Sequence, residues 1–435
     1  MKTKEQIKTE IYANLKEYYE SYLSAKRTSI PVSGKSYDEK ELISVVDALL
    51  DGWWTEGRII EEFEKKFKDY LGIKHTLVVN SGSSANLLAL KTLASSTLKE
   101  RRLIPGDEII TVAAGFPTTI NPIIECGCIP VFCDVDLATY NINLKQFKMA
   151  ITEKTKAVFI AHTLGNPFEI GEIKKECEKN NLWLIEDACD ALGATYNGQL
   201  IGTFGDLATF SFYPAHHITM GEGGALITNN DQLAKIARSI RDWGRNCFCK
   251  TGEDNTCGNR FKFKLGDLPY GYDHKYIYSE IGYNLKNTEL NVAIGLAQID
   301  KLPEFIKTRK RNFNLLKEKL KKYEEYFILP EETKNSQASW FGFLLTLRDK
   351  CKFTREELLD YLNKNKIGTR LLFGGNIIKQ PYFINNKVKY RIVEDLKNTD
   401  IVMKNTFWIG VCPLILEEDI ETMVERIGSF IHSND

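Results

Sequence analysis

The chain has 435 residues, of which 43% are hydrophobic and 27% are charged, the balance of a soluble globular protein. Its 58 basic and 58 acidic residues cancel, so the net charge gives no reason to expect binding to nucleic acid or to a membrane surface. The first 27 residues lack the apolar core of a signal peptide, and no apolar run approaches the roughly 18 residues of a membrane span. These features predict a cytoplasmic protein whose ten cysteines are reduced or metal-bound.

In chain order, the predicted elements begin with a polar amphipathic helix over residues 1–30. A second helix opens at residues 36–40 and is followed by a loop at residues 52–57. Short apolar runs then alternate with helical patterns, which is typical of an α/β protein with a mostly parallel sheet covered by helices. The predicted strands are 76–80, 108–112, 130–133, 157–161, 182–185, 208–213 and 225–228, and the helices among them are 84–93, one that includes 122–125, and 170–179.

Residues 242–280 interrupt this alternation. They are rich in Cys, Gly, Asn, Asp and Lys, which predicts an irregular insertion. Helices and strands resume from about residue 285. We therefore predict an N-terminal helical extension (1–35), a large domain (36–302) that contains the Cys-rich insertion 242–280, and a smaller C-terminal α+β domain (303–435).

A run of small residues, NSGSSAN, follows the strand predicted at residues 76–80 and contains Gly82, Ser83 and Ser84. Small residues let backbone N–H groups approach an anion at the positive end of a helix. Many such turns merely connect two elements, so the pattern alone leaves both readings open.

The segment SFYPAHHITMGEGG, from Ser211 onward, carries the adjacent histidines His216 and His217. It resembles the active-site segment of the DegT/DnrJ/EryC1/StrS sugar-nucleotide aminotransferases, which hold pyridoxal phosphate (PLP) as a Schiff base through a lysine five residues after the serine. His216 stands at that lysine position, and His217 is the rival. An imidazole forms no stable Schiff base, but it can move protons near neutral pH. The resemblance therefore implies a 3-dehydratase that binds pyridoxamine phosphate (PMP) non-covalently, with His216 as the base.

The resemblance covers about residues 35–430, rests on five motifs in the family's order, and implies the fold of type I PLP-dependent transferases and a homodimer with shared sites. It implies that Asp187 pairs with the pyridine nitrogen and that Phe116 stacks on the cofactor ring. From the residues alone, Asp187 could instead cap a helix and Phe116 could be a core residue. Asp190 stands where the family often has glutamine, and it is a further cofactor-binding residue that the resemblance implies. The phosphate ligands implied are Gly82, Ser83, Ser84, Ser211 and, reaching into the neighbouring subunit, Asn284.

Four cysteines follow the spacing C-x57-C-x-C-x7-C. Four thiolates can bind an iron–sulfur cluster or tetrahedral zinc, so the spacing leaves both open. The pattern resembles the [2Fe–2S] motif of the PMP-dependent 3-dehydratases that act on CDP-4-keto-6-deoxyglucose. That resemblance implies a cluster that relays electrons from a separate flavin and iron–sulfur NAD(P)H reductase. The four residues are Cys189, Cys247, Cys249 and Cys257.

Taken together, the resemblance implies deoxygenation at C3 of a nucleotide-linked 4-keto-6-deoxyhexose, with CDP as the nucleotide, in the synthesis of dideoxysugars for lipopolysaccharide O-antigen. Arg370 is the implied ligand of the substrate diphosphate, and a surface salt bridge is an equally good reading of this residue. Three alternatives stay open. They are an aminotransferase that uses another lysine such as Lys250, a cluster-free PMP dehydratase, and a non-catalytic zinc-binding regulator.

Overall fold

The computed structural model describes residues 1–23 and 27–434, and within these residues the largest sheet has eight strands. In the spatial order of the sheet, all neighbouring strands from β8 (Leu207–Ser211) to the edge strand β14 (Arg391–Ile392) run parallel. Strand β9 (Gly224–Thr228) runs antiparallel to both of its neighbours. The predicted mostly parallel sheet is confirmed. From edge to edge the strands are β1 (His75–Val79), β9 (Gly224–Thr228), β8 (Leu207–Ser211), β5 (Trp183–Asp187), β4 (Thr155–Ala161), β2 (Glu108–Val112), β3 (Ile129–Cys133) and β14 (Arg391–Ile392).

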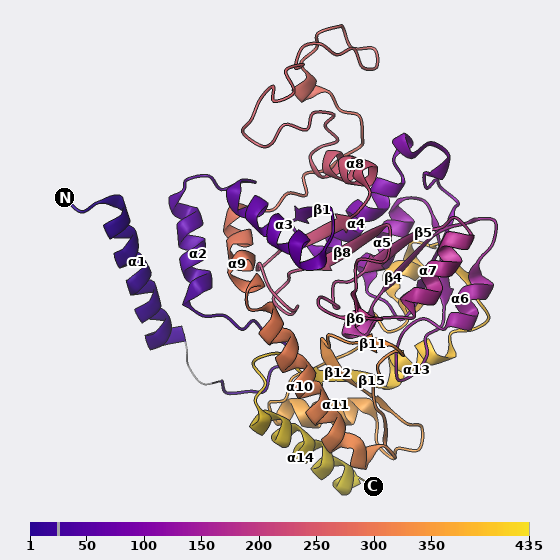
Figure 1. The fold of residues 1–435 in the computed structure, drawn as a ribbon. Coiled ribbons are helices and arrows are strands. Elements are labelled where there is room, and N and C mark those ends of the chain that lie inside the picture. Colours follow the sequence, from indigo (N-terminus) through magenta and orange to yellow (C-terminus); the bar gives the residue numbers. More distant parts are fainter. Residues whose placement is uncertain (24–26, 435) are drawn as a thin grey trace.

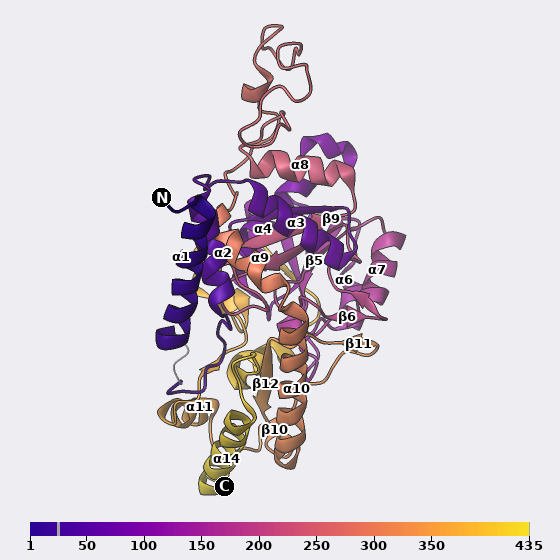
Figure 2. The same cartoon turned by 60° about the vertical axis from the view of Figure 1, so that its left-hand side comes forward.

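Helices cover both faces of this sheet (Figures 1 and 2). Successive residues of a strand point to opposite faces, so Leu77 and Val79 join one apolar core while Val78 joins the other. Burial on both faces explains why these strands read as continuous apolar runs. One face packs against α4 (Gly82–Leu93), α5 (Pro117–Glu125) and α8 (Asp231–Arg241), and the other against α3 (Arg58–Leu71), α6 (Leu144–Ala150), α7 (Ile170–Lys179) and α9 (Glu289–Ile299).

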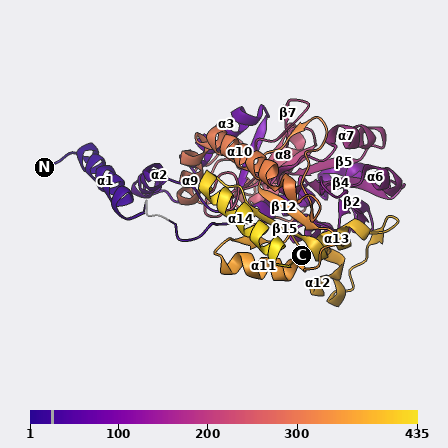
Figure 3. The same ribbon diagram turned by 90° about the horizontal axis from the view of Figure 1, so that it is seen from below.

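A second, antiparallel sheet lies in the C-terminal part and has its own apolar core, formed with three helices (Figure 3). Its strands are β10 (Phe327–Ile328), β12 (Gly342–Leu347), β15 (Thr406–Gly410) and β13 (Thr369–Arg370), and its helices are α10 (Leu302–Leu320), α11 (Arg355–Lys364) and α14 (Glu417–Asn434).

The C-terminal part also returns to the large sheet. Through β14, Arg391 and Ile392 pair with β3, and Phe383 packs with Phe132 of that strand. The predicted limit at residue 303 stays a prediction. Further elements are α12 (Pro381–Asn385), α13 (Lys397–Asn405) and a small sheet of β11 (Ser336–Gln337), β6 (Thr195–Tyr196) and β7 (Gln199–Leu200).

The N-terminal helix is shorter than predicted. Helix α1 (Lys4–Tyr18) continues as a π-helical turn, Tyr19–Leu23, and residues 24–26 lie outside the described part. Ile30 is not helical but forms a β-bridge with Ile367, because the chain there joins the C-terminal sheet region. Helix α2 (Glu39–Leu50) begins where expected. No helix of the described residues has both the length and the apolar character needed to cross a membrane.

Residues 242–280, all of them described, form the predicted irregular insertion and contain one short 3-10 helix, His274–Tyr276. The insertion projects from the body of the molecule beyond the end of α8 (Figures 1 and 2). Backbone pairing closes it at its base, where the Trp243 N–H donates to the Tyr283 carbonyl at 2.6 Å.

Candidate active site

The predicted cofactor residues gather at the carboxyl ends of three strands. Asp187 is the last residue of β5, Ser211 is the last residue of the neighbouring β8, and Gly82 opens α4 directly after β1. In open α/β sheets ligands bind at this edge, because the strand ends and the following helix N-termini meet there. The structure therefore brings together the residues that the separate motifs supplied.

The turn after β1 has the geometry of an anion site. Ser81 caps α4, and its Oγ accepts the Ser84 N–H at 3.0 Å. The first-turn N–H groups of Gly82 and Ser83 have no carbonyl of their own helix to bind. A twelve-residue helix adds the positive end of its dipole, and Ser211 lies beside it, so the turn suits a phosphate group.

Gly82 is needed for this close approach. A Cβ there would lie 2.5 Å from Cβ of Ser211 and 3.1 Å from Sγ of Cys189. We expect Gly82→Ala to lower the free energy of unfolding by about 1–3 kcal/mol, the usual cost of overpacking. Urea unfolding measures this, with the exposed neighbour Ser83→Ala as the control, for which a change within about 0.5 kcal/mol is expected. Equal stability of the two variants would contradict the tight contact.

Asp187 is buried and fixed by hydrogen bonds. Asn86 Nδ2 and Thr119 Oγ1 both donate to its Oδ2, at 2.9 and 2.7 Å. Its Oδ1 accepts the Cys189 N–H at 3.2 Å and retains capacity for a second donor. No helix begins after Asp187, so the reading of this residue as a helix cap was wrong.

His216 faces a carboxylate. Its Nδ1 lies 3.3 Å from Oδ1 of Asp190, and its ring centroid lies 5.1 Å from that of Phe341. The two polar side chains are 15% and 11% exposed, so the pair is largely shielded from water. Nδ1 makes no hydrogen bond within the described residues, so Asp190 is its ion-pair neighbour, and Nε2 is the ring nitrogen left to act as a base.

His217 has a different environment. It is buried, and its Nε2 donates to the Ser339 carbonyl at 2.8 Å. Burial holds the pKa of His217 well below its usual range, so the ring is neutral at pH 7. Because that nitrogen is already engaged, the geometry favours His216 over His217 as the base.

Arg309 of α10 fixes the backbone of this segment and was missed in the sequence. Its guanidinium is buried, and Nη2 donates to the carbonyls of Ala215 and His216, at 3.4 and 3.2 Å. Its Nη1 donates to the Phe341 carbonyl at 3.2 Å. Phe305 and Phe313 lie four residues to either side on the buried face of α10, and this apolar stripe was the available signal.

Three other predicted residues lie at the surface of the chain. Phe116 is 48% exposed at the start of α5, so it is not a core residue. Asn284 is exposed and bridges to Asp242 at the base of the insertion. Arg370 is exposed on β13, and the described residues offer it no carboxylate within ion-pair distance. The roles predicted for these three stay predictions.

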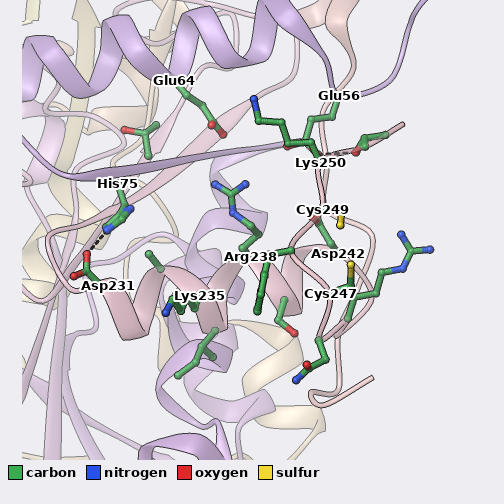
Figure 4. Close-up of a pocket in the computed structure, with 18 of the residues that line it drawn as sticks. Glu56, Glu64, His75, Asp231, Lys235, Arg238, Asp242, Cys247, Cys249 and Lys250 are labelled. Atoms are coloured by element: carbon green, nitrogen blue, oxygen red, sulfur yellow. Dashed lines mark hydrogen bonds and ion pairs between the residues drawn. The ribbon is translucent and has the colours of Figure 1, made fainter. Parts of the chain in front are cut away.

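The four predicted metal-binding cysteines lie in two places. Cys189 is next to Asp187 in the body, where burial raises the pKa of its thiol well above the usual range. Cys247 and Cys249 are in contact with each other beside a cavity of about 830 Å³ between α3, α8 and the insertion (Figure 4). Cys257 lies near them in the insertion. Among the described residues, no three His, Cys, Asp or Glu side chains are arranged to hold one metal, so a single chain does not form the predicted four-cysteine site.

The same cavity contains Lys250, the lysine that an aminotransferase alternative would need. Its Nζ pairs with Glu61 at 2.7 Å. None of the predicted cofactor residues lines this cavity. Lys250 therefore does not replace His216 at the candidate site.

The chain is similar to known proteins over most of its length. The chain is 56% identical to the lipopolysaccharide biosynthesis protein RfbH of Salmonella typhimurium over 405 aligned residues. This alignment covers 93% of this chain and 92% of the relative. The chain is also 49% identical to the dTDP-4-dehydro-2,6-dideoxy-D-glucose 3-dehydratase of Saccharopolyspora spinosa over 428 aligned residues, which are 98% of this chain and 92% of the relative.

The fold is also similar to that of solved protein structures. The Escherichia coli GDP-4-keto-6-deoxy-D-mannose-3-dehydratase with bound hydrated PLP matches with a TM-score of 0.82 and 30% identity over 92% of this chain and 99% of the other. The fold is thus that of the type I PLP-dependent transferases, as predicted. Residues 35–428 match a single family throughout, and the chain belongs to the DegT/DnrJ/EryC1/StrS aminotransferase family.

Proposed function

We propose that the chain is a PMP-dependent dehydratase that removes the C3 hydroxyl of a nucleotide-linked 4-keto-6-deoxyhexose. The observation that carries this proposal is His216, next to Asp190, at the position that the family resemblance assigns to the lysine. The relatives named as 3-dehydratases support the reaction class, and RfbH supports a role in lipopolysaccharide synthesis. We propose CDP-4-keto-6-deoxyglucose as the substrate, on the pattern of the cysteines.

The residues present fit PMP. One oxygen of Asp187 is saturated by two donors while the other can accept a ring N–H, and the first turn of α4 suits the phosphate. The ring of Phe116 contacts Phe373 edge-on and is 48% exposed, so it could also stack on the cofactor. When bound, the cofactor would supply an amine for the substrate ketone and a ring that accepts electrons.

The side chains then have separate tasks. With the cofactor bound, the Asp187 carboxylate would keep its ring nitrogen protonated. His216 Nε2 would accept a proton from the carbon attached to the ring, and Asp190, beside Nδ1, would stabilise the resulting imidazolium. Arg370, exposed and unpaired with any described carboxylate, would bind the diphosphate. A homodimer in which Asn284 contacts the neighbouring cofactor, and a cytoplasmic location, complete the proposal.

A 3-deoxy product requires two electrons in addition to dehydration. We propose that an NAD(P)H-dependent flavin and iron–sulfur reductase supplies them through a [2Fe–2S] cluster on Cys189, Cys247, Cys249 and Cys257. Within one chain, the described residues do not bring these four thiols together.

That same observation favours a second candidate, a dehydratase without a cluster, and the chain is 33% identical to the GDP-4-keto-6-deoxy-D-mannose 3-dehydratase of Yersinia pseudotuberculosis. Iron and sulfide analysis of anaerobically prepared protein separates the two. About two irons and two sulfides per chain support the first candidate, and none supports the second.

Borohydride reduction tests the absence of a lysine Schiff base. With His216 at the lysine position, we expect that reduction of the PLP-loaded protein attaches no pyridoxyl group to any lysine, as measured by peptide mass mapping. His216→Lys is the matched control and should become labelled at residue 216. Stoichiometric labelling of a lysine in the unaltered protein would remove the basis of the proposal.

A further inference from the structure

The loop that follows β13 contains a strained backbone position. Phe373 has a φ of 46°, in the left-handed region that bulky side chains rarely adopt. It is the first central residue of a tight turn, which the Gly375 N–H closes by donating to the Leu372 carbonyl at 3.0 Å. Turns with a positive φ at this position usually have glycine, asparagine or aspartate there. Such strain persists only where the surrounding structure enforces it, and it is frequent at functional sites.

Hydrogen bonds fix this turn against the segment that leads into α5. The Gly374 N–H donates to the Gly115 carbonyl at 3.2 Å. Farther along the loop, the Ile377 N–H donates to the Ala113 carbonyl at 3.0 Å. The C-terminal part of the chain therefore runs directly beside Phe116, the residue that follows Gly115.

Two aromatic rings meet at this point. The ring centroids of Phe373 and Phe116 lie 6.1 Å apart, and their planes are inclined at 76°, which makes an edge-to-face pair. Phe373 is half-buried and packs against the core of the large sheet, whereas Phe116 is exposed. An exposed ring with a fixed neighbour has less side-chain freedom to lose when a ligand packs on it, and this raises the affinity for the ligand.

We propose that Phe373 is a positioning residue, which holds the ring of Phe116 in place to stack on the cofactor and thereby raises the affinity for PMP. The unusual backbone of the turn is what brings an aromatic side chain to this point. This inference rests on the cofactor role proposed for Phe116 and adds the residue that supports it. The free energy of an edge-to-face pair corresponds to a change of about 2- to 10-fold in affinity.

A double-mutant cycle on PMP affinity tests this support. Phe373→Gly removes the ring and tolerates the positive φ, so it should raise the Kd for PMP about 2- to 10-fold, as measured by equilibrium dialysis of the purified chain. In the Phe116→Leu variant, which already lacks the stacking ring, the same change should have no measurable further effect. A purely structural role of Phe373 would raise the Kd equally in both backgrounds, and that result would overturn the inference.

Phe373→Ala is the matched control for the backbone. It also lacks the ring, so it should lose as much PMP affinity as Phe373→Gly does. Its Cβ retains the strain, however, and we expect it to unfold at a lower urea concentration than the glycine variant. Equal urea midpoints for the two variants would show that residue 373 is not held in the left-handed conformation, contrary to the inference.

Phe373→Tyr keeps an aromatic ring and should keep the Kd of the unaltered chain. An unchanged Kd in Phe373→Gly, beside a clear loss of affinity in Phe116→Leu, would overturn this inference and leave the stacking role of Phe116 in place. An unchanged Kd in Phe116→Leu would overturn that stacking role as well. No binding of PMP by the unaltered chain would overturn the proposed function itself.

Discussion

His216→Asn is expected to lower the rate of dehydration about 10²–10⁴-fold, the usual contribution of a general base. Asparagine has a similar size and polarity but cannot exchange a proton at pH 7. Cofactor binding should survive, because Asp187 and the first turn of α4 do not depend on the imidazole. Single-turnover loss of the substrate measures the rate, and a titration with PMP measures the affinity.

His217→Asn is the matched control for this experiment. It removes the buried hydrogen bond to the Ser339 carbonyl, so it should cost stability, about 1–3 kcal/mol, and change the rate far less than His216→Asn does. A near-normal rate in His216→Asn, with a large loss in His217→Asn, would transfer the role of the base to His217.

Asp187→Asn is expected to weaken PMP binding by about 2–5 kcal/mol, the cost of removing one partner of a buried charged pair. An amide NH₂ group in place of Oδ2 would also face two hydrogen-bond donors and no acceptor, because Asn86 and Thr119 both donate to that oxygen. The rate should fall as well, because a neutral amide cannot keep the ring nitrogen protonated. Equilibrium titration with PMP measures the affinity.

Thr119→Val provides the comparison for Asp187→Asn. It removes one donor to the same oxygen but leaves the carboxylate and the Asn86 hydrogen bond in place, so its effect on PMP affinity should be clearly smaller. If the two variants lost the same affinity, the charge of Asp187 would not be what binds the cofactor.

Much of the large sheet could be predicted from the sequence, because its strands are apolar on both faces. The strand predicted at 182–185 stopped short of Asp187, since two consecutive carboxylates resemble the end of a strand. The structure shows why Glu186 is nevertheless buried. Its carboxylate accepts the backbone N–H groups of Gly202, Phe204 and Gly205 at 2.7–2.8 Å, partners that no local pattern reveals.

The motifs of the candidate site could be predicted from the sequence, but the residues that hold the motifs in position could not. Gly82, Asp187 and His216 each belong to a local pattern, whereas Asn86, Thr119 and Arg309 act through contacts 68 to 101 residues away in the chain. The direction of the insertion was also beyond prediction, because an irregular segment has no periodicity that fixes which face it presents. For the same reason the spacing of the cysteines could not show that one chain leaves them apart.

Hydrogen bonds of its main-chain groups hold residue 216 in position. Its N–H donates to the Tyr213 carbonyl at 2.9 Å, and its carbonyl is bound by Arg309. Neither contact depends on the side chain, so an amine or an imidazole can occupy this position on the same backbone. The main chain at residue 216 is therefore held in the same way whether the side chain is a lysine or a histidine, and the choice between the two places no demand on the contacts that fix this segment.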